Sequence, residues 1–337
     1  MRAVVLVGGF GTRLRPLTFT TPKPMLPVGH RPIIENLVTM LAAAGIDEVV
    51  LALGFKPEPF REAFPDGTCA GVRLHYAVEP EPLDTGGAIR FAADHAGIDE
   101  TFVVVNGDVL TDLDVATLVD FHRARGAEAT IHLTPVEDPS AYGVVDLDER
   151  GRVSRFVEKP APGTAPTNLI NAGTYVFEPS VLGRIPTGRK VSIERETFPQ
   201  LVASGGLFAM STSDYWIDTG RPDTYRQANF DVLDGIRKSL RCDAVHAEAK
   251  VAETATLHHS LVSAGTSVGS DAFLTETIVL PGAVIERGAK VSGSIVMGRI
   301  GADAVVVDCV IGVDGSIDPG SERRNELVPD PATVSSR

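Results

Sequence analysis

The stretch that decides the fold is residues 3–27, AVVLVGGFGTRLRPLTFTTPKPMLP. Its apolar, largely β-branched start ends at a pair of glycines, which indicates a buried strand followed by a tight loop. The loop then carries Arg13 and Lys23 among four prolines, which disfavour a helix, so we expect an extended segment across the end of the strand. Glycines that expose backbone amides, followed by two fixed positive charges, predict a phosphate-binding segment.

The two common phosphate-loop patterns do not fit this stretch. A Walker loop needs Gly-x-x-x-x-Gly-Lys-Ser/Thr, which this stretch lacks. The dinucleotide fingerprint needs a third glycine where Leu14 stands in GFGTRL, residues 9–14. The stretch therefore predicts phosphate binding of another type, with a solvated Gly/Pro-rich connection as the alternative.

Beyond this stretch, the first 135 residues alternate strand-like and helix-like segments. The expected strands are 3–7, 48–53, 72–78, 102–105 and 129–133, and the expected helices are 33–44, 86–96 and 114–125. Such alternation is typical of βαβ units and a mainly parallel sheet, in which ligands bind at the carboxyl ends of strands. The loop Asn106-Gly107-Asp108 follows the fourth strand, so we expect it at that edge of the sheet.

The pattern changes between residues 140 and 180. YGVVDLDERGRVSRFVEKP, residues 142–160, predicts two strands that turn near Arg150-Gly151, and NAGTYVF, residues 171–177, predicts a third. We expect this insertion to form a second wall over the sheet. Helical and strand-like segments then resume to about residue 238.

The C-terminal part follows a different pattern. An aliphatic-(Gly/Glu)-x-x-Ala-x-aliphatic motif occurs in VGSDAFL (268–274), IERGAKV (285–291) and IGADAVV (300–306). Hexapeptide repeats of this type stack as coils of a parallel β-helix. An ordinary small β-domain is the alternative, and the polar residues 321–337 are expected to form a frayed tail.

Composition limits the possible partners. The formal net charge of −13 over 337 residues argues against nucleic acid or an anionic membrane as the main partner. The three cysteines lie far apart, without the spacing of a metal site or of a disulfide framework. The N-terminal apolar run is too short for a signal peptide, and no run approaches the length of a transmembrane helix. We therefore expect a soluble, cytoplasmic protein that acts on small molecules.

The pattern GGxGTRLxPLTxxxPKPxLPV, residues 8–28, resembles the signature of the sugar-phosphate nucleotidyltransferases, or nucleotide-sugar pyrophosphorylases. The resemblance extends over about residues 1–235. Together with the repeats it is most like the bacterial mannose-1-phosphate guanylyltransferase branch, which carries a left-handed β-helix. It implies an α/β, Rossmann-like, mainly parallel catalytic domain (1–238), a short left-handed parallel β-helix of hexapeptide repeats (245–320) and a polar tail (321–337).

The resemblance also implies a nucleotide-binding set. Arg13 corresponds to the residue that contacts the β- and γ-phosphates, and Lys23 to the one near the α-phosphate. The implied nucleotide-binding residues are Val7, Gly8, Gly9, Gly11, Thr12, Arg13, Lys23, Glu79, Gly86 and Gly87. Relatives that transfer thymidylyl or uridylyl groups carry Gln where Glu79 stands. A carboxylate only accepts hydrogen bonds and guanine offers a paired donor edge, so Glu79 favours GTP over UTP, with a solvated loop charge as the alternative.

A metal pair and a sugar-phosphate set follow from the same resemblance. Asp108 and Asp218 correspond to the carboxylates that hold Mg²⁺, the hard cation that nucleotidyl transfer requires. The implied sugar-phosphate-binding residues are Asn106, Gly143, Glu158, Lys159, Asn171 and Arg195, and the residues expected to carry catalysis are Arg13, Lys23, Asp108 and Lys159. No catalytic base is expected, because a sugar phosphate with a second pKa of about 6 is already largely dianionic near neutral pH.

The expected reaction joins GTP and α-D-mannose 1-phosphate to give GDP-mannose and pyrophosphate. Another nucleotide and sugar 1-phosphate pair remains open, as does a non-catalytic regulatory subunit that binds a nucleotide sugar. Such subunits tend to lose the residues that correspond to Arg13, Lys23, Asp108 and Asp218, and all four are present. An acyltransferase built on the β-helix would need a histidine inside well-formed repeats, which His258-His259 precede. We also expect a homo-oligomer, because a short β-helix leaves edges that association can cover.

Overall fold

The computed structural model describes residues 1–9, 11–54 and 57–332. By its internal contacts the chain divides into two compact units. Unit 1 comprises Met1–Gly9 and Ile34–Trp216, and unit 2 comprises Phe10–Ile33 and Ile217–Arg337. The opening loop therefore groups with the C-terminal part of the chain and not with the strand it leaves, which differs from the expected division near residue 238.

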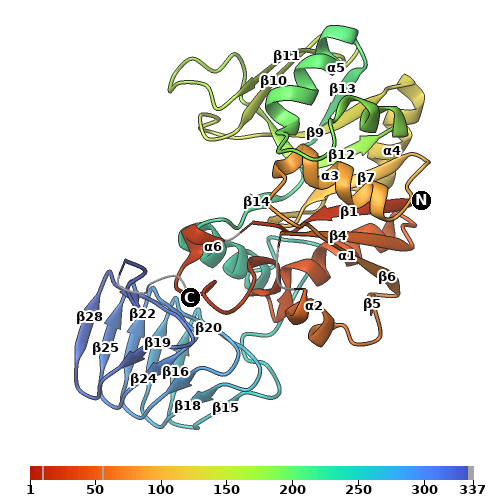
Figure 1. The fold of residues 1–337 in the computed structure, drawn as a ribbon. Helices are drawn as coiled ribbons and strands as arrows, with labels where there is room; N and C mark the ends of the chain where they lie inside the picture. Colours follow the sequence, from red (N-terminus) through yellow and green to blue (C-terminus); the bar gives the residue numbers. More distant parts are fainter. Residues whose placement is uncertain (10, 55–56, 333–337) are drawn as a thin grey trace. The chain divides into compact units, whose positions relative to one another are not determined.

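Unit 1 is organised around one mixed sheet with the strand order β11-β10-β12-β7-β1-β4-β6-β5 (Figure 1). Its parallel centre consists of β7 (Phe102–Asn106), β1 (Arg2–Leu6), β4 (Glu48–Leu53) and β6 (Val72–Val78). Leu6 pairs with Asn106 on one side and with Ala52 on the other. The expected mainly parallel arrangement is confirmed for these strands, which end side by side.

The insertion extends this sheet and does not cover it. β10 (Gly143–Leu147) and β11 (Val153–Glu158) form the predicted hairpin, and β12 (Leu169–Phe177) is the predicted third strand. β12 runs antiparallel to β7, and Val144 of β10 pairs with Ile170 of β12. The prediction of a second wall is wrong, because the backbone groups of β12 let the hairpin join the existing sheet. β9 (Ala129–Pro135) and β13 (Leu207–Ser211) continue beyond β12, and β5 (Thr68–Cys69) ends the β6 side.

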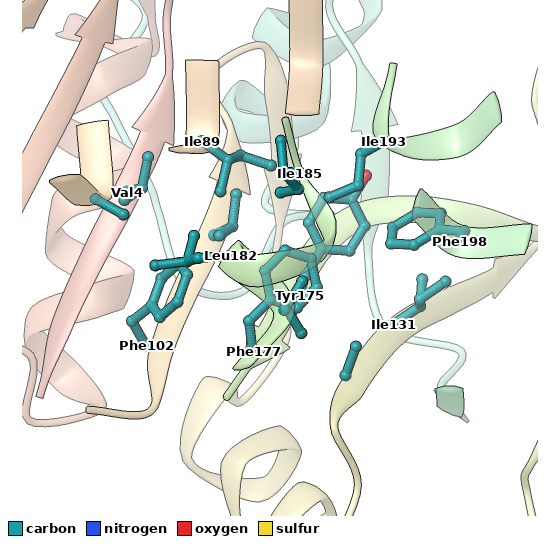
Figure 2. Packing of buried hydrophobic residues seen from close by; sticks show 14 of the residues in the cluster. Val4, Ile89, Phe102, Ile131, Tyr175, Phe177, Leu182, Ile185, Ile193 and Phe198 are labelled. Carbon is teal, nitrogen blue, oxygen red and sulfur yellow. The ribbon is translucent and has the colours of Figure 1, made fainter. Parts of the chain in front are cut away.

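An aromatic cluster fixes the position of β12 in the core. Tyr175 and Phe177 stack with ring centroids 5.6 Å apart, and Phe198 lies edge-on to both (Figure 2). Phe198 begins α5 (Phe198–Ser204), and Ile89 of α3 (Asp84–His95) joins the same buried cluster. These rings bury apolar area on one face of the sheet. Because β12 runs antiparallel to β7, the N-terminal part of β12 lies beside the carboxyl end of β7.

The remaining helices and short elements of unit 1 connect these strands. They are α1 (Ile33–Ala43, which begins at the unit boundary), α2 (Glu58–Ala63), β8 (Val109–Thr111), α4 (Val115–Arg125), a 3₁₀ segment (Pro179–Arg184) and a π-helical turn (Ile193–Thr197). The predicted helices correspond to α1, α3 and α4. Asp114 caps α4 by accepting from the amides of Ala116 and Thr117, and Gly126 ends it with a φ of 56°. None of the helices in the described ranges combines the length and apolarity needed to cross a membrane.

In unit 2, residues 11–33, called the strap below, fold into turns. Thr12–Leu14 and Lys23–Met25 are 3₁₀ turns, and β2 (Pro27–Val28) pairs with β3 (Arg31–Pro32). The expectation of an extended segment is wrong. Proline fixes φ near −65°, a value that suits a 3₁₀ turn as well as an extended chain, so prolines do not by themselves decide between the two. The strap is followed in this unit by Ile217 and Asp218 of β14 (Trp216–Asp218) and by α6 (Pro222–Leu233).

The C-terminal part of unit 2 is a parallel β-helix, as predicted (Figure 1). Over the described residues 250–328, three parallel sheets run through successive coils. The first sheet contains β15 (Lys250–Val251), β18 (Ser267–Val268), β21 (Val284–Ile285), β24 (Arg299–Ile300) and β27 (Ser316–Ile317); the second contains β16 (Thr256–His258), β19 (Phe273–Thr275), β22 (Lys290–Ser292), β25 (Val305–Val307) and β28 (Glu322–Arg324); the third contains β17 (Leu261–Val262), β20 (Ile278–Val279), β23 (Ile295–Val296), β26 (Val310–Ile311) and β29 (Leu327–Val328).

The sequence motif located the middle coils and missed one coil at each end. Val268, Ile285 and Ile300, which begin the three recognised repeats, pair in register and are buried. The coil before them has Ala252, and the coil after them has Asp318, where the motif requires Gly or Glu. β28 and β29 therefore lie in the segment predicted to be a frayed tail, which is wrong for residues 322–328; residues 333–337 lie outside the described part.

Candidate functional site

Unit 2 brings together two of the predicted cations and one predicted metal ligand. Lys23 is buried, with 7% of its surface exposed, and its Nζ lies 3.6 Å from Asp218 Oδ1. The same oxygen accepts a hydrogen bond of 2.7 Å from the amide of Gly220. Arg13 lies over Gly220, where a Cβ would be 2.8 Å from its Nη2. A buried lysine needs a partner charge, and Asp218 provides it, while Arg13 leaves the cluster with a net positive charge.

The fold of the strap explains why Arg13 faces outward. Gly11 has a φ of 59°, a left-handed conformation that suits glycine, and its carbonyl accepts from the Thr18 hydroxyl at 2.7 Å. The buried side chains of Leu14 and Leu17 anchor the following turn. Arg13 is exposed beside these anchors, so an arginine that the sequence assigned to phosphates is accessible to an anion.

In unit 1, the predicted base-reading residue lies next to the end of the first strand. Glu79 is 7% exposed, its Oε2 accepts a 2.8 Å hydrogen bond from the Leu83 amide, and its Oε1 lies 3.3 Å from where a Cβ on Gly8 would be. Burial raises the pKa of the Glu79 carboxyl, and the Leu83 amide partly opposes that shift. The space around Gly9 is open, since a Cβ there would meet no atom of the described residues within 4 Å. Glu79 is therefore a built-in buried acid and not a solvated loop charge.

The other nucleotide-binding candidates lie in three separate segments. Val7 continues the first strand, its amide donating to Ala52 O at 3.0 Å, and Thr12 is exposed in the first turn of the strap. Gly86 and Gly87 lie in the first turn of α3, where their amides donate to the Val191 carbonyl at 2.8 and 3.1 Å. These two glycines bring residues 189–193 close to α3, a packing role that the sequence did not suggest.

The loop after β7 places Asn106 and Asp108 near β12. The Gly107 amide donates to Leu6 O at 2.8 Å, which holds the loop against the end of β1. A Cβ on Gly173 would lie 2.7 Å from Asn106 Nδ2, so the Asn106 amide covers the bulged part of β12. Asp108 is half-buried, and its charge acts on the Tyr175 hydroxyl, whose pKa is raised first by burial and then by Glu194, Glu158 and Asp108.

The remaining sugar-phosphate candidates surround the same end of β12. Asn171 donates from Nδ2 to the Tyr175 hydroxyl at 2.9 Å, and its Oδ1 accepts from the Gly173 amide at 3.1 Å. Gly143 pairs with Glu158, and a Cβ on Gly143 would be 3.0 Å from Glu158 Oε2.

Charged groups of both signs meet at Glu158. The Lys159 ammonium lies 3.8 Å from Glu158 Oε1. Burial and the nearby Glu194 raise the pKa of Glu158, while Lys159 and Arg195 lower it. The structure therefore brings Glu158, Lys159 and Arg195 into one cluster, in which two cations face two carboxylates.

Sequence reasoning missed Glu194. Its Oε2 accepts hydrogen bonds from the Thr85 hydroxyl at 2.8 Å and from the Ser192 hydroxyl at 2.7 Å. It thereby links the start of α3, beside the predicted base-reading loop, to the π-helical turn that carries Arg195. Thr85 and Glu194 lie 109 positions apart in the sequence, so no local pattern could have paired them.

The described residues contain no cluster of three or more His, Cys, Asp or Glu side chains of the kind that holds a metal ion. Of the two predicted Mg²⁺ ligands, Asp108 belongs to unit 1 and Asp218 to unit 2. The metal pair therefore stays a prediction.

Two family models match successive parts of the chain. Residues 2–235 match the family described as nucleotidyl transferase, and residues 228–326 match the GlmU-like, C-terminal hexapeptide family. The chain is 43% identical over 300 residues to a mannose-1-phosphate guanylyltransferase of Mycobacterium tuberculosis, a match that covers 88% of this chain and 83% of the relative. It is 38% identical over 334 residues to mannose-1-phosphate guanylyltransferase 1 of Arabidopsis thaliana, with coverage of 97% and 90%.

Solved structures resemble about two thirds of the chain. HddC from Yersinia pseudotuberculosis complexed with GMP-PN is 30% identical and superposes with a TM-score of 0.58, covering 68% of this chain and 97% of that chain. A putative glucose-1-phosphate thymidylyltransferase from Bacillus anthracis is 25% identical, with a TM-score of 0.62 and coverage of 68% and 94%.

Proposed function

We propose that this chain, which belongs to the nucleotidyl transferase family, joins GTP and α-D-mannose 1-phosphate to give GDP-mannose and pyrophosphate. The observation that carries the proposal is the cluster in which buried Lys23 and exposed Arg13 meet at Asp218 and Gly220. Asp218 balances only one of the two positive charges of Lys23 and Arg13, and the triphosphate of a nucleotide is an anion that matches the remaining charge. The names of relatives that match most of the chain support the choice of mannose 1-phosphate and of a guanylyl group.

The reaction needs alignment and charge neutralisation more than it needs a base. An oxygen of the sugar phosphate forms a bond to the α-phosphorus, the bond between the α-phosphorus and the bridging oxygen breaks, and pyrophosphate leaves with that electron pair. Arg13 and Lys23 stabilise the charge on the triphosphate and on the leaving pyrophosphate. Lys159 and Arg195 hold the phosphate of the sugar. Glu158 accepts hydrogen bonds from the sugar hydroxyls, and the Asn171 amide donates to them.

Asp108 and Asp218 suit Mg²⁺ as ligands. Magnesium takes one or two carboxylates together with phosphate oxygens and water, and each of these residues offers a half-buried carboxylate beside residues assigned to phosphates. When bound, the ion would supply positive charge to the phosphate oxygens. Asp218 is held by the Gly220 amide and by Lys23, which keeps its carboxylate oriented.

Glu79 is assigned to the base. Its carboxylate is buried, its Oε2 is occupied by the Leu83 amide, and its Oε1 lies beside Gly8. An acceptor-only group suits the N1–H and N2–H₂ donors of guanine, whereas an amide suits uracil or thymine.

We also propose that the protein acts in the cytoplasm, where nucleoside triphosphates are available. We further propose a homo-oligomer, which would cover exposed β-helix side chains such as Phe273 and Leu327.

A pyrophosphate-release screen tests the proposal. GTP, ATP, UTP and dTTP are each combined with mannose, glucose and heptose 1-phosphates in the presence of Mg²⁺. We expect the largest kcat/KM for GTP with mannose 1-phosphate. A larger value for another pair would overturn the substrate assignment, and absence of release with every pair would favour a non-catalytic nucleotide-sugar-binding protein.

A further inference from the structure

The strap contacts the β-helix where Pro16 meets Gly312. A Cβ on Gly312 would lie 2.8 Å from Pro16 Cβ and 2.9 Å from Pro16 O, and both residues are buried. Gly312 follows β26 in the C-terminal half of the β-helix, and Pro16 lies three residues after Arg13. Pro16 of the strap therefore packs against the β-helix at Gly312, where there is room for it because this residue has no side chain.

The β-helix itself does not require glycine at this position. Register pairs Val279 with Val296 and Val296 with Ile311, so the following residue is Leu280 or Met297 in the two preceding coils and Gly312 in this one. Leu280 and Met297 carry large side chains there.

The other glycines of the β-helix sharpen the contrast. Apart from Gly312, four glycines in the described coils have no positive φ: Gly269, Gly298, Gly301 and Gly315. At each of these four, a Cβ would meet other atoms of the β-helix. At Gly312 the three nearest atoms all belong to Pro16. The missing side chain is therefore explained by the strap and not by coil stacking.

Helix α6 links the β-helix to the other half of the strap. Arg226 donates from Nη1 to the Gly293 carbonyl of the β-helix and lies 3.9 Å from Asp308. One residue before it, the Tyr225 hydroxyl donates to the Pro27 carbonyl, and Asn229 Oδ1 accepts from the Gly29 amide at 3.2 Å. The strap is thus held near Pro16 by the β-helix and near Pro27 by a helix that the β-helix also holds.

Both phosphate-binding cations depend on these two points of attachment. Lys23 lies between Pro16 and Pro27 in the chain, and Arg13 is separated from Pro16 only by Leu14 and Arg15. A displacement of Pro16 would move both cations relative to Asp218 and Gly220. Misplacing a positioning group by about 1 Å can cost about a hundredfold in rate, so a small shift here is measurable.

We propose that the β-helix is part of the nucleotide-binding machinery. Gly312 is a positioning residue: because it has no side chain, Pro16 packs against it, and this contact fixes the positions of Arg13 and Lys23. The inference rests on the proposed function in assigning the strap to the triphosphate. It gives the β-helix a role within its own subunit, separate from any role in association.

The variant Gly312→Ala tests the contact between Pro16 and Gly312. The backbone conformation at residue 312 accepts alanine, and the nearest atoms that the added methyl group would meet all belong to Pro16. We expect the KM for GTP to rise about tenfold with the KM for mannose 1-phosphate unchanged. Amide hydrogen exchange in the strap should also accelerate, notably at Leu14 and Leu17, whose amides donate to Gly11 O and Leu14 O at 2.9 and 3.0 Å. The matched control is Gly269→Ala, whose methyl group would meet Arg287 N at 2.6 Å inside the β-helix and should lower thermal stability without changing the KM for GTP.

Unchanged strap exchange and an unchanged KM for GTP in Gly312→Ala would overturn the inference. If Gly312→Ala does not fold, Arg226→Ala, which releases α6 from Gly293, carries the test: faster strap exchange supports the coupling and unchanged exchange refutes it. Hydrogen exchange measures how readily the backbone hydrogen bonds of the strap open, and it does not require turnover. A wild-type protein that releases no pyrophosphate would therefore contradict the proposed function while the exchange data still decide this inference.

Discussion

Units 1 and 2 hold their candidate functional residues in different ways. In unit 1 they stand at the ends of regular strands, and hydrogen bonds such as Leu83 to Glu79 and Asn171 to Tyr175 fix them. In unit 2 the cations stand on a strap without long regular elements, which is held by α6 and by Gly312. We infer that the two units recognise different parts of the substrates. The rigid sheet of unit 1 suits the discrimination of base and sugar, whereas the strap of unit 2 suits an anion that is recognised by its charge.

The largest effect is expected for Lys23→Met in unit 2. Removing a cation from developing phosphate charge should lower kcat/KM by about a hundredfold or more, because such contacts act where charge builds in the transition state. Methionine retains the apolar stem, so the fold should survive. Steady-state pyrophosphate release measures the effect, and Lys250→Met, an exposed lysine of the β-helix, serves as the control. Equal activity of the two variants would remove Lys23 from the phosphate site.

In unit 1, Asp108→Asn should lower kcat by about a hundredfold without lowering the melting temperature. The change removes one carboxylate charge and keeps the shape of the side chain. Turnover measured across a Mg²⁺ titration checks it, with Asp120→Asn on the exposed face of α4 as the matched control. Full turnover with magnesium would show that Asp108 does not bind the metal.

A smaller and more selective effect is expected at Glu158. Glu158→Gln should raise the KM for mannose 1-phosphate about tenfold, because a hydrogen bond to a charged group is worth about 1.5–3 kcal/mol. The KM for GTP should stay constant, which is the opposite of the selectivity expected for Gly312→Ala. Equal changes in both KM values would break the proposed division between the units.

Glu79→Gln should produce the smallest change in rate, a several-fold loss of preference for GTP over UTP. It should also alter how stability depends on pH. Since burial raises the pKa of Glu79 in the folded protein, folding favours its protonated form, and the stability from that proton is lost as the pH rises from about 4 towards the raised folded pKa. Denaturant unfolding at several pH values should therefore show Glu79→Gln gaining stability relative to wild type with rising pH. An unchanged nucleotide preference would refute the assignment of Glu79 to the base.

Local patterns predicted most of unit 1 because its strands and helices are separately encoded. Residues 48–53 and 72–78 coincide with β4 and β6. The patterns could not say that the hairpin at 143–158 would join the sheet, since an edge and a second layer both bury one face of a hairpin. Nor could they pair Thr85 with Glu194, because that contact depends on the packing of α3 against residues 189–193.

Unit 2 was less predictable for a related reason. The prolines of the strap restrict φ without selecting between turn and extended chain, and its grouping with the β-helix rests on contacts such as Pro16 with Gly312 that are remote in sequence. Repeats reveal a β-helix only where they match the motif, so the coils containing Ala252 and Asp318 were missed. The residues implied by the signature were nevertheless found in clusters within each unit.

One labelled substrate tests whether this chain joins GTP to mannose 1-phosphate through attack by the sugar phosphate. Mannose 1-phosphate carrying ¹⁸O in its non-bridging phosphate oxygens is incubated with GTP and Mg²⁺, and both products are analysed by mass spectrometry. We expect GDP-mannose and pyrophosphate in equal amounts, with all of the label in GDP-mannose. Label in pyrophosphate, or GTP hydrolysis without GDP-mannose, would contradict it.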